Sequence, residues 1–515
     1  MTQAYLRAWG GIAFLALSSV AFGLEVDHDV IQALRANSND KIISVVVNLQ
    51  GQLDLSSIGN NAGTELEKGP LIAKQLETFN STSASPLIRF FKTANLAGLK
   101  EITPIWLTNS LRIRGTSDVI QKLLSMNGVE SIVMDSGKSV SEFDDQSHAL
   151  ASLEKKKDTK VSWGVTKVRA PELWAQGVTG KGITVAMIDS GANLKHPDLL
   201  PNIWQNPGET GMDDKGKDRT TNGIDDDKNG YVDDVVGWNF EGKNNDPTDS
   251  EGHGSQTAGI VGGMGAGGTQ TGVAPGVKLM ILRSCCDAGA QIFESNTWEA
   301  MQYALKNGAR VISMSLSVKH PANPSYAKWR RAGEVMLAAG VVHVNSAGNR
   351  GSGFTPHNVG APATNPPAWA FPKQVLLTGL SSMIAIGATD QNDKLRYYSS
   401  IGPVTWEDIP EYKDFPYSDG KSGLIRPDVC GPSEVPSTAM TGAGYTSSFG
   451  GTSSATPNVA GVVALLLSAK PNLSVAQVTE ALQMSTVQVE TSFNNKCGAG
   501  RVDAVAAVDY AKARF

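Results

Sequence analysis

The chain has 515 residues, of which 41% are hydrophobic, with 54 glycines, 24 prolines and a formal net charge of −5. This composition is typical of a loop-rich globular protein with more than one domain, not of a disordered or fibrous one. The acidic balance excludes nucleic acid as a partner, because no basic stripe could displace counterions from phosphates. Apart from the N-terminus, no long uncharged apolar span occurs, so we expect no stable membrane anchor.

The first 23 residues have the pattern of a secretory signal peptide. Arg7 precedes the apolar stretch 10–21, which is short for a membrane span. Ala21 and Gly23 are the small residues expected ahead of a signal-peptidase cut. We therefore expect a secreted or periplasmic protein. The alternative is an uncleaved anchor.

Four cysteines stand at Cys285, Cys286, Cys430 and Cys497, and in an exported protein they allow three full pairings. A bridge between the adjacent Cys285 and Cys286 requires a strained ring. A bridge between Cys430 and Cys497 is compatible with the sequence, and buried thiols are the alternative for all four.

Residues 24–140 predict a small α+β domain. Strands are expected over 42–49, 104–107, 110–114 and 129–134, and helices over 71–92 and 119–126. This order of strands and helices is that of ferredoxin-like modules. Residues 141–160 are polar and include Lys155-Lys156-Lys157, which predicts an exposed linker open to proteolysis.

From residue 161 to residue 515, apolar runs alternate with helical patterns. Strands are expected over 183–188, 278–283, 310–316, 341–346 and 383–389, and helices over 297–306 and 326–339. Near-continuous apolar runs are typical of parallel strands covered on both faces. We therefore expect an α/β fold with a three-layer, doubly wound parallel sheet, preceded by the small ferredoxin-like domain.

Three short segments carry the residue types of a hydrolytic triad. Asp189 ends an apolar strand, His253 stands at a glycine-rich helix start, and Ser453 begins an apolar helix. A serine hydroxyl needs a base within hydrogen-bond reach and a third group that orients the base. The chain order Asp, His, Ser is one of three known for this geometry. Taken singly, the three residues have simpler interpretations as a turn aspartate, a structural histidine and a capping serine.

A fourth polar residue follows another apolar strand. The run 341–346 leads into Ala347-Gly348-Asn349. An amide side chain at such a strand end can donate a hydrogen bond to an oxyanion. The simpler interpretation of Asn349 is an asparagine in a turn.

Together these blocks resemble the subtilisin-type serine proteases, the subtilase family, over roughly residues 160–515. The resemblance implies a subtilisin-like fold in which Asp189 orients the general base His253. It also implies that Ser453 is the nucleophile and that Asn349 donates to the oxyanion, with the Ser453 backbone N–H as a second donor. The His block departs from the family pattern, because Gln256 stands where a second histidine is usual.

The segment 313–317 resembles the strand that lines the primary specificity pocket of subtilases and pairs with substrate. The resemblance implies that Ser315, Leu316 and Ser317 bind substrate. Ser317 replaces a usual glycine, so we expect it to narrow the pocket and favour small side chains.

The same resemblance implies that residues 24–140 are an inhibitory, fold-assisting propeptide. A cut within 136–160, made by the enzyme itself, would release the catalytic domain 161–515. The partners implied are peptide or protein substrates and the chain's own propeptide as inhibitor, and we expect a monomer. The competing hypothesis is a permanent regulatory domain.

Residues 222–234 predict a calcium loop between the Asp and His blocks. Oxygen-bearing side chains alternate and are followed by a glycine, as in the EF-hand loop. The candidate ligands are Asp225, Asp227, Asn229, Tyr231 through its carbonyl, Asp233 and Asp234. Val236 stands at the twelfth position in place of the closing glutamate, so Asp234 is expected to substitute. A charged surface turn is the alternative, and Asp198, Asp213, Asp214 and Asp218 are weaker candidate ligands.

We therefore favour a secreted, calcium-stabilised serine endopeptidase, made as an autoprocessed zymogen. The alternative is a catalytically inactive subtilase-fold protein that binds peptides. An esterase of another serine hydrolase class is disfavoured, because Ser453 lacks the Gly-x-Ser-x-Gly elbow and the chain order differs.

Overall fold

The computed structural model describes residues 24–36, 41–55, 64–94, 96–140, 160–286, 291–366, 383–406, 409, 424–491 and 493–515. The expected signal peptide and residues 141–159 of the expected linker lie outside the described residues. The chain divides into two compact units. Unit 1 comprises Met1–Gly51, Thr82–Pro104 and Asn109–Met134, and unit 2 comprises Gln52–Ser81, Ile105–Thr108 and Asp135–Phe515.

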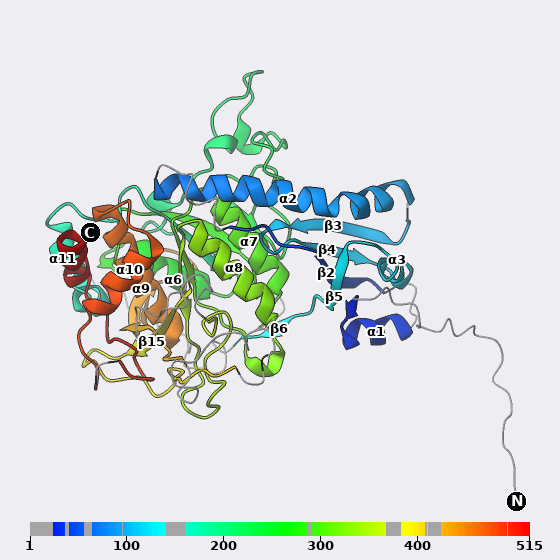
Figure 1. Cartoon of the computed structure of the whole chain (residues 1–515). Helices are drawn as coiled ribbons and strands as arrows, with labels where there is room; N and C mark the ends of the chain where they lie inside the picture. Colours follow the sequence, from blue (N-terminus) through cyan, green and yellow to red (C-terminus); the bar gives the residue numbers. More distant parts are fainter. Residues whose placement is uncertain are drawn as a thin grey trace, which may run out of the picture. The chain divides into compact units, whose positions relative to one another are not determined.

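Unit 1 contains a five-stranded sheet in the order β1-β5-β2-β4-β3, of which β2 to β5 are labelled in Figure 1. The strands are β1 (Glu25–Val26), β2 (Ile43–Leu49), β3 (Leu99–Ile105), β4 (Ser110–Gly115) and β5 (Val129–Met134), and the helices are α1 (His28–Arg35), α2 (Glu65–Ala94) and α3 (Ser117–Leu123). β2 pairs antiparallel with both β4 and β5. Buried Val45 and Val47 share one core with Leu87 and Phe91 from the part of α2 in unit 1. The predicted mixed module is confirmed, with α1 and β1 added at one edge.

One strand of this module was placed wrongly by the sequence. The structure has a strand over Leu99–Ile105, and the predicted residues Trp106 and Leu107 form a 3-10 turn (Trp106–Thr108) instead. All three residues of this turn belong to unit 2 and are buried, and the Leu107 N–H donates to Gln302 Oε1. Their apolar character therefore reflects the burial of a turn, which the sequence pattern did not distinguish from a strand.

Unit 2 is built on a seven-stranded parallel sheet in the order β16-β15-β14-β13-β8-β11-β9. The strands are β8 (Thr184–Asp189), β9 (Gly237–Asn239), β11 (Lys278–Arg283), β13 (Val311–Met314), β14 (Val342–Ser346), β15 (Met383–Thr389) and β16 (Val429–Pro432). The five predicted strands are present. The two edge strands β9 and β16 were missed because they are short and contain glycine or proline.

Helices cover both faces of this sheet, as expected for a doubly wound fold (Figure 1). They are α6 (His253–Gly262), α7 (Glu294–Lys306), α8 (Tyr326–Ala338), α9 (Gly451–Ala469), α10 (Val475–Met484) and α11 (Ala504–Arg514), with short α4 (Trp163–Lys167) and α5 (Ala170–Trp174) ahead of β8. The chain passes from β8 to the edge strand β9, from β9 through α6 to β11, and from β11 through α7 to β13 on the other side of β8. α6 packs against α9, and α7 packs against β8 and β11.

Helix α9 is the centre of the core. It packs against β13, β14, β15 and β16, and residues 459–467 are fully buried. Of the described helices it alone is long and apolar enough to cross a membrane, but 89% of that span is buried inside the domain. Its apolar character is therefore that of a core helix.

All four cysteines are in disulfides. One bridge joins Cys430 to Cys497, and the other joins the adjacent Cys285 and Cys286.

Candidate active site

The carboxyl end of β8 is where the sheet's connections change direction. β11 lies on one side of β8 and β13 on the other, so the connections leave a crevice at this end. Ligands of open α/β sheets bind in such crevices. Asp189 is the last residue of β8, and Asn349 and Ser315 follow β14 and β13 at the same edge. The fold therefore places three of the predicted residues around one crevice.

Asp189 is buried and is hydrogen-bonded to His253. Asp189 Oδ1 lies 2.7 Å from His253 Nδ1 and also accepts the Ser190 N–H at 2.8 Å. Asp189 Oδ2 accepts the Thr257 hydroxyl at 3.3 Å. With Nδ1–H donating to the carboxylate, the other ring nitrogen, Nε2, is the one that can accept a proton.

His253 is the first residue of α6, and tight backbone packing fixes its position. A Cβ at Gly254 would lie 2.0 Å from the Gly191 carbonyl oxygen, so only glycine allows this helix start to approach the turn after Asp189. The His253 ring also makes an edge contact with Phe449, with the ring centroids 5.3 Å apart. Phe449 ends β18 (Tyr445–Phe449), four residues before Ser453.

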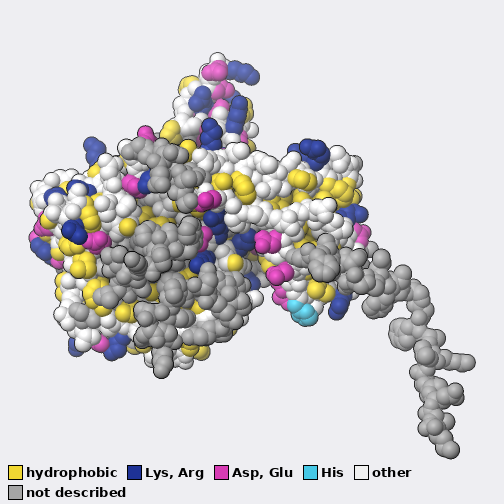
Figure 2. All heavy atoms as spheres, viewed as in Figure 1, with side chains coloured by type: hydrophobic (Ala, Val, Ile, Leu, Met, Phe, Trp, Pro, Cys, Tyr) yellow, Lys and Arg dark blue, Asp and Glu magenta, His cyan; other side chains and the backbone are white. Residues whose placement is uncertain are grey.

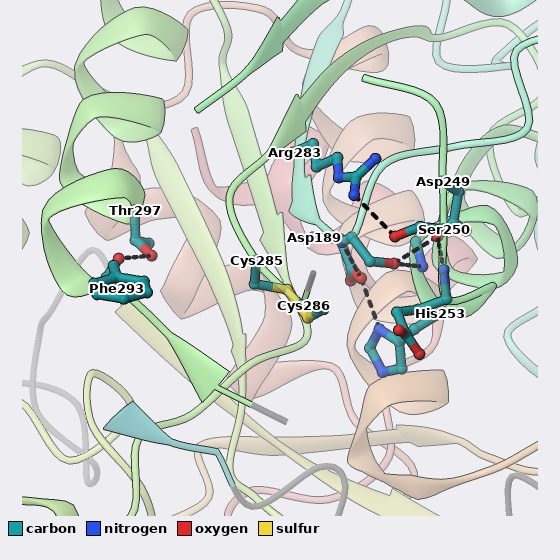
Figure 3. Close-up of a disulfide and its surroundings, with 12 residues drawn as sticks. Asp189, Asp249, Ser250, His253, Arg283, Cys285, Cys286, Phe293 and Thr297 are labelled. Atoms are coloured by element: carbon teal, nitrogen blue, oxygen red, sulfur yellow. Dashed lines mark hydrogen bonds and ion pairs between the residues drawn. A yellow bond between two sulfur atoms is a disulfide. The ribbon is translucent and has the colours of Figure 1, made fainter. Parts of the chain in front are cut away.

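Asp249 was not singled out from the sequence, yet it organises the turn that leads to His253 (Figure 3). Its Oδ1 accepts the Ser190 hydroxyl at 2.8 Å and the N–H groups of Glu251 and Gly252. Its Oδ2 accepts both the N–H and the hydroxyl of Ser255, at 2.7 and 2.6 Å. Ser190 Oγ in turn accepts the Gly254 N–H at 2.9 Å. Asp249 therefore links the turn after Asp189 to the first turn of α6. In sequence it resembles an ordinary charged turn residue.

Ser453 lies in the first turn of α9, fully buried. α9 packs against α6, so the two candidate catalytic groups lie at the starts of neighbouring helices. Ser453 Oγ makes no hydrogen bond to any described residue. A helix start carries partial positive charge, which favours negative charge developing beside it.

Asn349 is fixed by the same helix start. Its Oδ1 accepts the N–H and the hydroxyl of Thr452, both at 2.9 Å. Because the amide oxygen is used in this way, the NH₂ end of the side chain is the end that can donate toward an oxyanion. A Cβ at Gly451 would lie 2.8 Å from this Asn349 nitrogen, and Gly451 has a φ of 76°. Glycine at this position gives the amide room.

The predicted substrate segment lies directly after β13. Ser315 Oγ donates to the Ser453 carbonyl at 3.0 Å, which places this segment beside the candidate nucleophile. Ser317 Oγ and Ser346 Oγ are 3.4 Å apart, so the hydroxyl at the usual glycine position contacts the residue that ends β14. Leu316 is fully buried.

An extended piece, residues 138–140, lies between β12 and the residues that follow this segment, a place that we call the peptide groove. We call residues 138–140 the tail strand; it belongs to unit 2. Its β6 part (Lys138–Ser139) pairs antiparallel with β12 (Gln291–Ile292). On the other edge Val140 bridges Val318, and the Lys319 N–H donates to the Ser139 carbonyl at 3.1 Å. The tail strand is thus hydrogen-bonded on both edges, as a bound peptide strand would be.

Gln256, the departure from the family pattern, has structural partners. Gln256 Nε2 donates to the Gly252 carbonyl at 3.0 Å, and its Oε1 accepts the Thr446 hydroxyl at 3.2 Å. It therefore attaches α6 to β18.

The structure brings together fewer carboxylate ligands of the acidic loop than the sequence predicts, and it adds one residue, Glu209, that the sequence did not predict. Carboxylate oxygens of Glu209, Asp225 and Asp227 lie within 4.8 Å of one another. Asp233 instead accepts the Gly223 N–H with both oxygens at 3.1 Å. Asp234 is buried and hydrogen-bonded to Asn206, Asn229 and Tyr303. On the segment at the top of Figure 2, acidic side chains lie among lysine and arginine side chains.

Glu209, at the end of a 3-10 turn (Pro207–Glu209), fits a cation. Its Oε1 accepts the N–H groups of Asp226 and Asp227 at 2.7 and 3.2 Å, and its buried Oε2 has no partner among the described residues. Burial raises the pKa of this carboxyl, and the charges of Asp226 and Asp227 raise it further. A hard cation supplies the charge that such an oxygen set lacks. Glu209 was missed because it lies 13 residues before the loop, which begins at residue 222.

Part of the chain matches a described protein family and several known proteins. The subtilase family model matches residues 180–500. Subtilisin DY of Bacillus licheniformis is 28% identical over 346 residues, which is 67% of this chain and 98% of that protein. Alkaline elastase YaB of Bacillus sp. (strain YaB) is 28% identical over 67% of this chain and 70% of its own length. Bacillopeptidase F of Bacillus subtilis (strain 168) is 25% identical over 87% of this chain and 29% of its own length.

Proposed function

Because this chain belongs to the subtilase family of serine peptidases, we propose that it is a secreted endopeptidase with the triad Asp189, His253 and Ser453. The observation that carries the proposal is the 2.7 Å contact between Asp189 Oδ1 and His253 Nδ1. Ser453 at the start of the neighbouring helix α9 and Asn349 beside it support the same assignment.

The proposed reaction is acyl transfer. His253 Nε2 takes the proton of Ser453 Oγ as this oxygen attacks the peptide carbonyl carbon. The resulting oxyanion receives hydrogen bonds from Asn349 Nδ2 and from the Ser453 backbone N–H. Asp189 stabilises the imidazolium, which then protonates the leaving amine. Water, activated by the same histidine, hydrolyses the acyl-enzyme.

We also propose that the chain is made as a zymogen and that residues 24–140 act as its propeptide. The tail strand supports this, because residues 138–140 pair on one edge with β12 and on the other with Val318, as a substrate strand would. In that arrangement the scissile bond lies on the C-terminal side of Val140, so the range expected for the first cut narrows from 136–160 to 141–160. The competing hypothesis, a permanent regulatory domain, predicts that mature protein retains residues 24–140.

Calcium is the proposed structural cation. Glu209, Asp225 and Asp227 would hold it, with Asn229 and the Tyr231 carbonyl as further oxygen donors from the same loop. The ion would crosslink the 3-10 turn of Glu209 to the loop and so stabilise the segment between the Asp and His blocks. It has no proposed part in the reaction.

The deciding experiment compares the wild-type chain with Ser453→Ala. We expect wild type to hydrolyse unfolded protein, to react with a fluorophosphonate, and to release a fragment ending within 141–160, as read by intact mass. Ser453→Ala should do none of these. Equal shortening of both chains would refute self-processing. A folded wild type that neither hydrolyses nor reacts would favour the catalytically inactive, peptide-binding alternative.

A further inference from the structure

The bonded pair Cys285–Cys286 lies between the catalytic carboxylate and the peptide groove (Figure 3). On one side, the Arg283 end of β11 is in register with Asp189, and the Ser284 N–H donates to the Asp189 carbonyl at 3.0 Å. On the other side, Cys285 makes an antiparallel bridge to Ile292 of β12. Only Ser284 therefore lies between Arg283, the end of the strand that pairs with β8, and Cys285 of the disulfide.

Ile292 connects the disulfide to the groove. One edge of this residue bridges Cys285, and its other edge pairs with Lys138 of the tail strand. β12 has only two residues, so it has little pairing of its own to hold it in place. β12 forms one wall of the peptide groove, and its position therefore depends on the bridge between Ile292 and Cys285.

The disulfide holds a backbone conformation that a free cysteine rarely adopts. Cys286 has a φ of 91°, in the left-handed region that is uncommon for residues other than glycine. Both cysteines are 1% exposed. A bond between adjacent side chains closes a small ring and restricts the two residues, so the turn persists without glycine.

We propose that the Cys285–Cys286 ring is a positioning device that holds β12 as a fixed wall of the peptide groove. This inference rests on the proposed peptidase function for its kinetic consequence. The ring acts through Ile292, which pairs with Lys138, two residues before Val140, so it governs the binding of extended substrates. Neither cysteine takes part in the chemical step.

The kinetic test uses the processed enzyme and the double variant Cys285→Ser/Cys286→Ser. Two substrates share one leaving group and one P1 residue; one is a blocked tetrapeptide and the other a blocked single residue. We expect kcat/KM for the tetrapeptide to fall about tenfold, mainly through KM, which is the size of effect expected for losing one or two backbone hydrogen bonds. The value for the single-residue substrate should stay within about twofold, because it does not reach β12.

Two matched variants separate positioning from general stability. Cys285→Ser/Cys286→Gly lacks the bond but places at position 286 a residue that adopts positive φ freely. It should recover at least half of the lost tetrapeptide preference. Cys430→Ser/Cys497→Ser removes the other disulfide and should lower the melting temperature while the ratio of the two kcat/KM values stays unchanged.

A second readout does not need activity. In the full-length Ser453→Ala chain, the amides of residues 291–292 should exchange with solvent at least tenfold faster when Cys285 and Cys286 are replaced by serine, while those of β8 stay protected. Unchanged exchange there, an unchanged substrate ratio, or alkylation of Cys285 and Cys286 without prior reduction would each overturn the proposal. A wild type inactive on both substrates would refute the proposed function, and the exchange measurement would still decide the role of the ring.

Discussion

Two groups of carboxylates in unit 2 contrast in how their oxygens are satisfied. Ahead of His253, Asp189 and Asp249 are buried and accept hydrogen bonds from backbone N–H groups, hydroxyls and the imidazole. In the acidic loop, Glu209, Asp225 and Asp227 lie within 4.8 Å of one another, and the buried Glu209 Oε2 has no partner among the described residues. Asp225 and Asp227 do accept N–H groups, so the deficit of donors in this group is at Glu209 Oε2, which belongs to a cluster of three carboxylates.

The contrast shows that the supply of hydrogen-bond donors around a carboxylate decides whether it acts as a fixed acceptor or as a cation ligand. A buried carboxylate surrounded by donors is a fixed acceptor, which can orient an imidazole or close a turn. Neighbouring carboxylates with too few donors repel each other, and a cation relieves both the repulsion and the missing partner. The first group should therefore be sensitive in catalysis, and the second in stability.

The largest effect is expected at Asp189. Asp189→Asn keeps the size of the side chain but replaces one acceptor with a donor, so it favours the wrong tautomer of His253 and removes the stabilisation of the imidazolium. We expect kcat to fall about 10⁴-fold. Steady-state kinetics measure this, with circular dichroism to show that the fold is kept.

Asp509→Asn is the matched control, because Asp509 is exposed on α11. It should leave kcat within about twofold, as surface changes of this type have small effects. Comparable losses in the two variants would show that charge in general, and not the contact with His253, matters, and the first half of the contrast would fail.

The sequence was sufficient where the chemistry lies in contiguous residues. Apolar runs predicted five of the seven strands of unit 2, and short motifs pointed to Asp189, His253 and Ser453, whose roles remain predictions. It was insufficient where the partner is a backbone group or a distant residue. Asp249 accepts mostly from N–H groups and hydroxyls that only the folded turn brings together, and Glu209 reaches the acidic loop through a separate 3-10 turn. Neither arrangement leaves a periodic pattern.

Asp249 should give the next largest effect. In Asp249→Asn an NH₂ group replaces one oxygen and faces existing donors, such as the Ser255 or Gly252 N–H, so the turn before His253 must shift. We expect kcat to fall about 10- to 100-fold with KM nearly unchanged, because a shift of about 1 Å in a catalytic group has this scale of effect. The pH profile of kcat should also move, since His253 is held differently. An exposed neighbour, Glu251, serves as control through Glu251→Gln. A proportional rise in KM would instead indicate a distorted groove.

Calcium removal should affect stability and leave the chemical step intact. Excess chelator is expected to lower the melting temperature of the processed wild type by about 5 °C, the scale of losing an ion present well above its dissociation constant. Glu209→Gln should abolish most of this calcium-dependent shift, while kcat at 25 °C stays within about twofold. Asp509→Asn should keep the shift. A melting temperature insensitive to chelator in wild type would remove the case for a bound cation.

The smallest effect is expected at Asp233, where loop spacing and donor supply disagree. Spacing makes Asp233 the ninth-position ligand of the calcium loop. In the structure, both of its oxygens accept the Gly223 N–H at 3.1 Å, so they are already satisfied. Asp233→Asn keeps one acceptor, and asparagine tolerates the φ of 53° at this position. We expect the calcium-dependent shift to remain and the melting temperature to change by less than about 2 °C, the scale of one weakened hydrogen bond. Loss of the calcium response in this variant would mean that ligand spacing, and not the supply of donors, identifies the cation site.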